Sequence, residues 1–166
     1  QYCRYDPANP NGLNTDPIYD AFCDKDGNVW LGTYFGGINF WNGKKSFFNT
    51  WQSGVGNWSL GGNVVSCLSE DVHGNLWVGL EDMGLNCINT SNGQVTRYTS
   101  QNSGLSYNNI HDLHFIDDQT LWIATYTGGI NILDIKSNTF SYLNVKNAPG
   151  LHSDNIYAFM QLGDSL

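Results

Sequence analysis

The chain has 166 residues, of which 40% are hydrophobic and only 13% charged, so it can bury a core and is not expected to be disordered. Seven Lys and Arg against fifteen Asp and Glu leave a formal charge of -8, which disfavours nucleic acid and acidic lipid as partners. No stretch approaches the ~20 apolar residues that span a bilayer, so direct membrane contact is not expected of this segment. The 14% aromatic residues and 19 glycines indicate an all-β chain of short strands and tight turns.

A unit of about 46 residues recurs along the chain and decides the expected fold. Trp30, Trp77 and Trp122 are spaced by 47 and 45 residues. Equivalent leucines stand near the start of four successive units, at Leu13, Leu60, Leu105 and Leu151.

Each unit contains four short runs of β-branched and aromatic residues separated by turn residues, and no helical periodicity. In the third unit, strands are predicted near 110–116, 120–125, 129–134 and 139–143. A four-stranded antiparallel unit of this length, stacked on copies of itself, is typical of a propeller blade. The predicted fold is therefore all-β, a β-propeller fragment of about three and a half blades.

The unit boundaries predict one propeller domain. Residues 1–12 hold the last strand of a preceding blade, 13–59, 60–104 and 105–150 are three blade repeats, and 151–166 begin a fourth. Because the segment starts and stops inside blades, its open edges are expected to pair with the remaining blades of the parent propeller or with another copy of itself.

Structural roles are predicted for glycines and tryptophans at fixed places in the unit. Gly just before the third strand supplies the positive φ of a tight hairpin, and Gly in the second strand lets the neighbouring blade approach closely. The preceding Trp is expected to fill the gap between blades. These residues are Trp30, Trp77, Trp122, Gly32, Gly79, Gly37, Gly84 and Gly129.

The motif at 71–79, Asp-x-x-Gly-Asn-Leu-Trp-Val-Gly, followed by Gly-Leu-Asn at 84–86, resembles the two-component regulator propeller repeat. Segments 24–33 with 36–39, and 121–125 with 128–131, resemble it as closely. In that family, such repeats build paired seven-bladed propellers in the periplasmic part of hybrid sensors, many of which respond to oligosaccharides. The resemblance implies a periplasmic sensing segment whose parent protein is a sensor histidine kinase.

A candidate ligand surface is predicted where the loops between the second and third strands meet the loops that enter each blade. Planar aromatic rings can stack on a sugar ring, while Asp, Glu and Asn accept hydrogen bonds from its hydroxyl groups. The alternative is that the aromatic rings pack over the edge of their own blade and that the acidic pair is a solvated turn. The candidate residues are Tyr34, Phe35, Trp58, Glu81, Asp82, Tyr107, Tyr126 and Thr127.

Catalysis is not predicted for this segment. Asp20 and Asp112 share one position of the innermost strand and could in principle form a glycosidase pair, but Cys67 and Ala158 occupy that position in the other units. No cofactor is implied. A protein-docking scaffold without a small ligand remains the second hypothesis, and a propeller lyase the third.

No metal site is predicted either. Residues 24–28 superficially resemble a calcium loop, but the Gly falls at the wrong offset and no Glu closes the loop, so a hairpin turn is favoured. His111 and His114, three residues apart in a strand, point to opposite faces and are given surface or packing roles. The four cysteines lack CxxC spacing and are interpreted as free, mostly buried thiols: Cys3, Cys23, Cys67 and Cys87.

Overall fold

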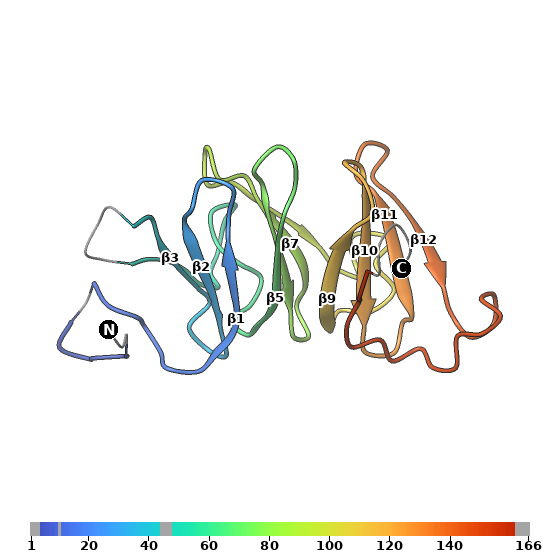
Figure 1. The fold of residues 1–166 in the computed structure, drawn as a ribbon, viewed down its shortest axis with the longest axis horizontal. Coiled ribbons are helices and arrows are strands. Elements are labelled where there is room, and N and C mark those ends of the chain that lie inside the picture. Colours follow the sequence, from blue (N-terminus) through green and yellow to red (C-terminus); the bar gives the residue numbers. More distant parts are fainter. Residues whose placement is uncertain (1–3, 10, 44–47, 162–166) are drawn as a thin grey trace.

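The computed structural model describes residues 4–9, 11–43 and 48–161. This described part forms three four-stranded sheets and contains no helix (Figure 1). The strand orders are β1-β2-β3-β4, β5-β6-β7-β8 and, read from the other edge, β12-β11-β10-β9. Every pairing is antiparallel and joins strands that are consecutive in the chain, so each sheet is a meander as predicted.

The strand bounds follow the repeat from unit to unit. The first sheet consists of β1 Ile18–Cys23, β2 Val29–Thr33, β3 Ile38–Trp41 and β4 Asn49–Trp51. The second consists of β5 Val65–Glu70, β6 Leu76–Leu80, β7 Gly84–Ile88 and β8 Val95–Tyr98. The third consists of β9 Ile110–Phe115, β10 Thr120–Thr125, β11 Ile130–Asp134 and β12 Thr139–Leu143, within one residue of the predicted strands.

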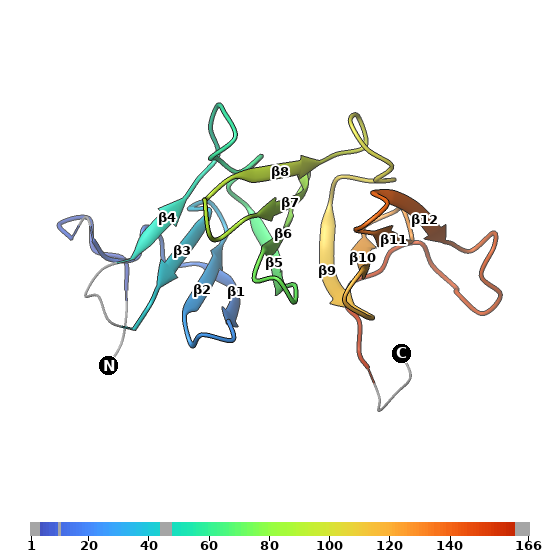
Figure 2. The ribbon, with the colours of Figure 1, turned by 90° about the horizontal axis from the view of Figure 1, so that it is seen from above.

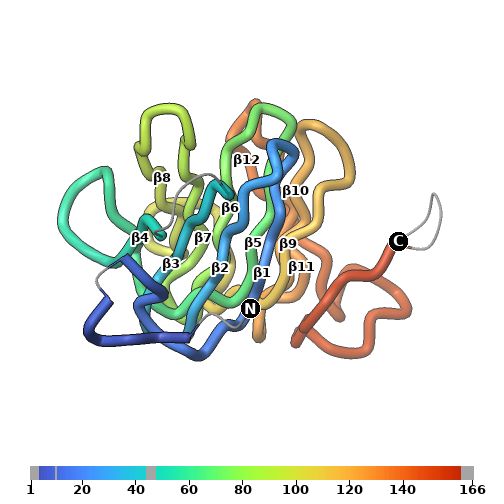
Figure 3. The backbone as a smooth tube through the Cα atoms, turned by 60° about the vertical axis from the view of Figure 1, so that its left-hand side comes forward, coloured from blue at the N-terminus to red at the C-terminus, as the bar shows by residue number. Residues whose placement is uncertain are grey.

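The three sheets stand side by side like blades, with β1, β5 and β9 innermost and the outer strands fanning apart (Figure 2). The partial propeller predicted from the repeat is confirmed. The β1–β2 and β5–β6 turns lie at one end of the blades, here called the hairpin end, which is uppermost in Figure 1. The β2–β3, β6–β7 and β10–β11 connections lie at the other end, here called the loop end (Figure 3).

Apolar side chains from adjacent sheets form one core between the first and second blades and another between the second and third. A Cβ added at Gly32 would lie 2.6 Å from Cγ1 of Val65, and one added at Gly79 would lie 2.8 Å from Cγ2 of Ile110, each in the following blade. The predicted close approach at these glycines is confirmed. Trp30 and Trp77 are buried in the two cores, as expected.

The glycines before the third strand also behave as predicted. Gly37, Gly84 and Gly129 have φ values of 72°, 75° and 70°. A Cβ at each of them would also collide with the carbonyl oxygen of the residue ending the outer strand, in Trp51, Tyr98 and Leu143. Conformation and space therefore both require glycine there.

Polar side chains of the inner strands link each blade to the next. Oδ2 of Asp20 accepts the backbone N–H of Leu68 at 2.7 Å, and the hydroxyl of Ser66 donates to the carbonyl of Ile110 at 2.6 Å. The Asp20 carboxylate also accepts the N–H of Ala21 at 2.8 Å. The Asp20 carboxylate therefore has a structural role, because its hydrogen bonds hold two inner strands together.

Residues 151–161 repeat this arrangement against β9, although no strand is formed there. Oδ2 of Asp112 accepts the N–H of Phe159 at 2.7 Å, and Nδ1 of His111 lies 3.0 Å from the carbonyl oxygen of Ile156. The segment thus occupies the place of an inner strand of a following blade. At the other end of the chain, a strand of a preceding blade was predicted within residues 1–12; residues 1–3 and 10 lie outside the described part, and residues 4–9, 11 and 12 form no strand.

The Asp that opens the repeat motif holds the hairpin at the hairpin end. Oδ1 of Asp71 accepts the N–H groups of His73 and Asn75, both at 2.9 Å. Its Oδ2 accepts Nδ2 of Asn75 at 2.8 Å and Nε1 of Trp77 at 3.1 Å. Burial by itself raises the pKa of Asp71, but these hydrogen bonds outweigh it and lower the pKa overall.

Asp24 accepts the equivalent four hydrogen bonds in the first blade, from Asp26, Asn28 and Trp30. The segment at 24–28 is therefore the hairpin turn that the sequence favoured over a calcium loop. Asp117 of the third blade bonds Gln119 and Thr120 instead.

The Asn of the Gly-Leu-Asn motif is buried and holds the segment that enters its own blade. Oδ1 of Asn39 accepts the N–H of Asn14 at 3.1 Å, and Oδ1 of Asn86 accepts the N–H of Gly61 at 2.9 Å. The amide group of Asn39 also donates to the Asn14 side chain at 2.8 Å. Gly61 has no side chain to offer, so the buried Nδ2 of Asn86 has no hydrogen-bond partner.

The cysteines of the described residues are free thiols, as predicted, but they differ in burial. Cys67 is buried and Cys87 half-buried, whereas Cys23 is exposed. Burial raises the pKa of Cys87 to about 12, which keeps it a protonated thiol. Cys3 lies outside the described residues.

Candidate ligand-binding site

Main-chain hydrogen bonds fix the loops at the loop end. The N–H of Tyr34 donates to the carbonyl of Pro17 at 3.1 Å, and the N–H of Tyr126 donates to that of Asn109, also at 3.1 Å. Glu81 makes the equivalent bond to Val64 at 3.0 Å. Each loop between the second and third strands of a blade is thus tied to the segment that enters that blade.

Three aromatic rings gather at the loop end of the first blade. The ring of Tyr34 lies 4.9 Å from the ring of Tyr19 and 4.2 Å from that of Phe35, measured between centroids. Phe35 is 65% exposed. Tyr34 therefore packs against the inner strand of its own blade, as the alternative reading held, yet the group still presents aromatic surface to solvent.

A second aromatic group lies at the loop end of the third blade. The ring of Tyr126 is 6.4 Å from that of Tyr107 and 5.8 Å from that of His111. His111 in turn stacks on Tyr157 at 4.5 Å, with 19° between the ring planes. Thr127 follows Tyr126 and is exposed.

The second blade contributes carboxylates between these aromatic groups. Asp82 has a φ of 64°, a left-handed conformation that Asp tolerates better than most residues. Its Oδ1 accepts Nδ2 of Asn109 at 3.1 Å, which joins this loop to the third blade. Desolvation is the largest cause that raises the pKa of Tyr19 in the neighbouring first blade, followed by Tyr34 and Glu81.

Trp58 is not brought together with the other candidates, and its predicted placement at the loop end is corrected. It lies beside Gly93 in the β7–β8 turn, and the N–H of Val95 donates to the carbonyl of the preceding Asn57 at 2.6 Å. The Arg97 guanidinium holds this segment against β8 by donating to the carbonyl and hydroxyl oxygens of Ser59. The segment therefore covers an outer strand instead of entering the blade at the loop end.

Three residues of this surface were not among the candidates: Tyr19, His111 and Tyr157. They occupy the same position of successive inner strands, which Ser66 holds in the second blade. The repeat spacing places these residues at one equivalent position, so the sequence alone could have identified them as a group. We call the aromatic and acidic residues at the loop end the loop-end cluster: Tyr19, Tyr34, Phe35, Glu81, Asp82, Tyr107, His111, Tyr126, Thr127 and Tyr157.

The loop-end cluster combines exposed aromatic faces with carboxylate oxygens that can accept hydrogen bonds. Asp20 and Asp112, the one carboxylate pair considered for glycoside hydrolysis, each accept a backbone N–H from the following inner strand. Within the described ranges, no group of three or more His, Cys, Asp or Glu side chains could hold a metal ion.

The fold and repeat thus define a partial propeller with a polar and aromatic surface at one end. Residues 12–35 and 59–82 match the family model of the two component regulator propeller. These two segments are therefore two-component regulator propeller repeats, as the motifs at 24–33 and 71–79 predict.

Several solved structures share this fold. The chain is similar to the extracellular domain of BT3049 from B. thetaiotaomicron, assigned to a hybrid two component system, with 19% identity and a TM-score of 0.77 over 87% of this chain and 20% of that one. It is similar to the extracellular domain of BT4673 from B. thetaiotaomicron, with the same assignment, at 19% identity and a TM-score of 0.57, covering 96% and 29%.

A third similar structure is PorZ, a surface component of the type-IX secretion system of Porphyromonas gingivalis, at 18% identity and a TM-score of 0.56, covering 80% and 24%. At these identities the likeness establishes the fold, and the chain spans between 20% and 29% of the length of these three chains. A search of curated proteins found no match. In the part of the chain that the structure describes, no helix has the length and apolarity needed to cross a membrane.

Proposed function

We propose that this chain is a periplasmic segment of a two-component sensor and that its loop-end cluster contacts an oligosaccharide. The observation that carries the proposal is the gathering of exposed aromatic rings from two blades around the carboxylates of the blade between them. Aromatic faces can stack on pyranose rings, and carboxylate oxygens accept hydrogen bonds from hydroxyl groups.

The blades supply a rigid platform for such a site. Because every loop of the cluster is held by main-chain hydrogen bonds to its own blade, little conformational entropy is lost on binding. A ligand can then signal only by favouring one arrangement of the receptor over another. On this proposal the segment itself is not an enzyme, and phosphotransfer belongs to a histidine kinase in the parent protein.

A calorimetric titration of oligosaccharides into the parent ectodomain, with this chain in parallel, tests the proposal. Saturable binding of one glycan is expected, and retention by this chain would assign the site to its loops. Replacing Tyr34 or Tyr126 by Ala should weaken binding by about tenfold each, the loss typical of a central aromatic contact.

Trp58→Ala is the matched control, because Trp58 is an exposed aromatic residue that lies away from the loop end. It should leave the affinity unchanged. Unchanged affinity in the Tyr34 and Tyr126 variants would refute the assigned site. No binding across a broad panel, with the ectodomain folded, would refute the sensor proposal and favour the docking scaffold.

A further inference from the structure

A cavity of about 320 Å³ lies between the first and second blades at the hairpin end, away from the loop-end cluster. Trp30, Phe40 and Trp51 line it from the first blade, and Glu70 and Leu76 from the second. The three aromatic rings pack together, with the centroids of Trp30 and Phe40 4.3 Å apart and those of Trp30 and Trp51 5.5 Å apart. The size is at the lower end of small-molecule sites, about 300 to 1,000 Å³.

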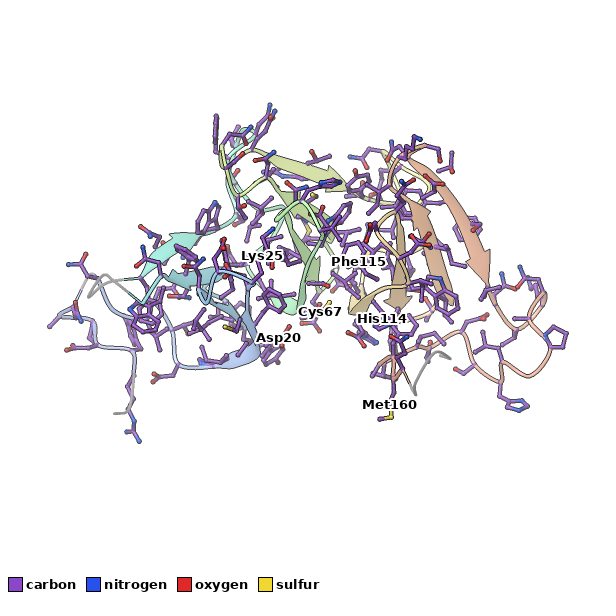
Figure 4. The ribbon with its side chains drawn as sticks, turned by 45° about the horizontal axis from the view of Figure 1, so that its top comes forward. Asp20, Lys25, Cys67, His114, Phe115 and Met160 are labelled. Carbon is purple, nitrogen blue, oxygen red and sulfur yellow. The ribbon has the colours of Figure 1, made fainter. Side chains whose placement is uncertain are left out.

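Comparison with the next gap between blades shows why this space is open. Glu70 pairs with Leu76 as Phe115 pairs with Leu121, so the two residues hold the same place in successive inner strands. Phe115 packs edge-on against Trp77, with 6.4 Å between centroids. Figure 4 shows Phe115 between the second and third sheets and Lys25 between the first and second.

A second position also differs between the two gaps, although Val95 does not itself line the cavity. Val95 pairs with Ile88 as Phe140 pairs with Leu133, and Phe140 lies 6.2 Å from Tyr98 in the filled gap. Two phenylalanines of the filled gap are therefore replaced by Glu and Val in the open one.

The charges around the cavity are unbalanced. Among the described residues that line the cavity, Asp24, Asp26 and Glu70 supply three carboxylates and Lys25 one ammonium group, which leaves two net negative charges in this set with His73 neutral. Asp24 has a lowered pKa, because the hydrogen bonds from Trp30 and Asn28 outweigh its burial, so it is ionised at neutral pH.

Lys25 only weakly neutralises Glu70. Its Nζ is 4.0 Å from Oε1 of Glu70, and its side chain is 55% exposed. Glu70 is only 14% exposed and its Oε2 accepts the backbone N–H of Lys25 at 3.2 Å, so the carboxylate stays in place at the cavity. The Lys25 ammonium group makes only a long-range contact and is largely in solvent, so a cation that enters the cavity can take its place beside Oε1.

We propose that this inter-blade cavity binds an organic cation, a substituted ammonium group whose carbon body lies against Trp30, Phe40 and Trp51 and whose charge faces Glu70. Aromatic rings attract cations through their negative faces, and this attraction is strongest where water is excluded. A neutral ligand of the same shape would gain the apolar contact but neither the ring attraction nor the carboxylate. This site is independent of the sugar surface at the loop end.

Choline and its uncharged isostere 3,3-dimethylbutan-1-ol are the probes that separate these contributions. Each is titrated into the chain at pH 7, with binding followed by calorimetry and by tryptophan fluorescence, since Trp30 and Trp51 line the cavity. Choline should bind saturably and at least tenfold more tightly than the isostere, and added salt should weaken it. Equal affinities, or no saturable binding of choline, would overturn the proposal.

Variants of Glu70 assign the site within the chain. Glu70→Gln should weaken choline binding by about tenfold while leaving the isostere unchanged. Glu70→Phe should fill the cavity as Phe115 fills its own gap and abolish binding of both probes. Asp117→Asn, a carboxylate removed from the third-blade hairpin, is the matched control and should change neither affinity.

If the Glu70→Gln variant bound choline as tightly as the wild-type chain, the assignment of the cation site to Glu70 would be overturned. This test holds even if Glu70→Phe fails to fold. Oligosaccharide binding at the loop end should be the same in Glu70→Gln as in the wild type, so failure of one proposal is distinguishable from failure of the other.

Discussion

The hairpin carboxylate of the second blade allows a sharp test of what the repeat motif does. Asp71 is 7% exposed and accepts four hydrogen bonds, from His73, Asn75 and Trp77. In Asp71→Asn one oxygen remains as an acceptor, but the amide group that replaces the other meets two donors and the charge is lost. Hydrogen bonds to a charged group contribute about 1.5 to 3 kcal/mol each, and solvent near the hairpin end screens part of this.

We therefore expect Asp71→Asn to lower the free energy of unfolding by about 2 kcal/mol. With a urea m-value of about 2 kcal/mol/M, the midpoint should fall by about 1 M, measured by tryptophan fluorescence. Asp117→Asn is the control, because Asp117 bonds Gln119 and Thr120 in an exposed turn without a Trp partner, and its midpoint should stay close to that of the wild type. Equal midpoints for the Asp71 and Asp117 variants would refute the reasoning.

The same carboxylate should make stability depend on pH. The folded state lowers the pKa of Asp71, so its contribution is fully present above the unfolded value of about 3.9 and is lost as pH falls through the folded pKa. The stability gap between wild type and Asp71→Asn should therefore be constant near neutral pH and shrink below about pH 4. A gap that is the same at pH 3 and pH 7 would contradict a charged hydrogen-bond acceptor.

Three further substitutions test the contacts between and within blades. Gly79→Ala should destabilise the chain by about 2 kcal/mol in urea unfolding, because its Cβ would collide with Sγ of Cys67 in its own blade and crowd Ile110 in the next, and a neutral result would contradict this close packing. Gly61→Ser should raise stability by about 1 kcal/mol by giving the buried amide of Asn86 an acceptor, and no gain would show that the amide already finds a partner. Asp112→Asn should speed hydrogen exchange of the Phe159 amide, which unchanged exchange would disprove.

The blade architecture could be predicted because its determinants recur at a fixed spacing. Gly79, two residues after Trp77, lies where two blades approach closely, and Gly84 lies in a hairpin. Both glycines can be recognised without knowing the surrounding residues. Strand bounds in the third unit followed to within one residue for the same reason. Local backbone demands of this kind can be read from residue type alone.

The candidate site could be predicted only in part, because loop paths depend on particular long-range contacts. Trp58 precedes the second unit in sequence, yet Arg97 bonds the backbone of its segment and holds it over an outer strand. Tyr19 lies in an inner strand and Tyr157 at the corresponding repeat position of residues 151–161, whereas the predicted ligand contacts lay only in loops. The cavity at Glu70 could not be predicted, because it depends on which side chains of two neighbouring blades face the same gap.

The links between inner strands suggest how such a domain can gain a blade. Asp20 and Asp112 each bond an amide of the following unit, and Ser66 and His111 reach the carbonyl of the first inner-strand residue of that unit. In each of these hydrogen bonds, a side chain of the first, second or third unit bonds a main-chain atom of the following unit. A duplicated unit could therefore make these polar links without a matching polar side chain in its neighbour, so only the apolar contacts between blades would have to be matched when tandem duplication enlarges such a propeller.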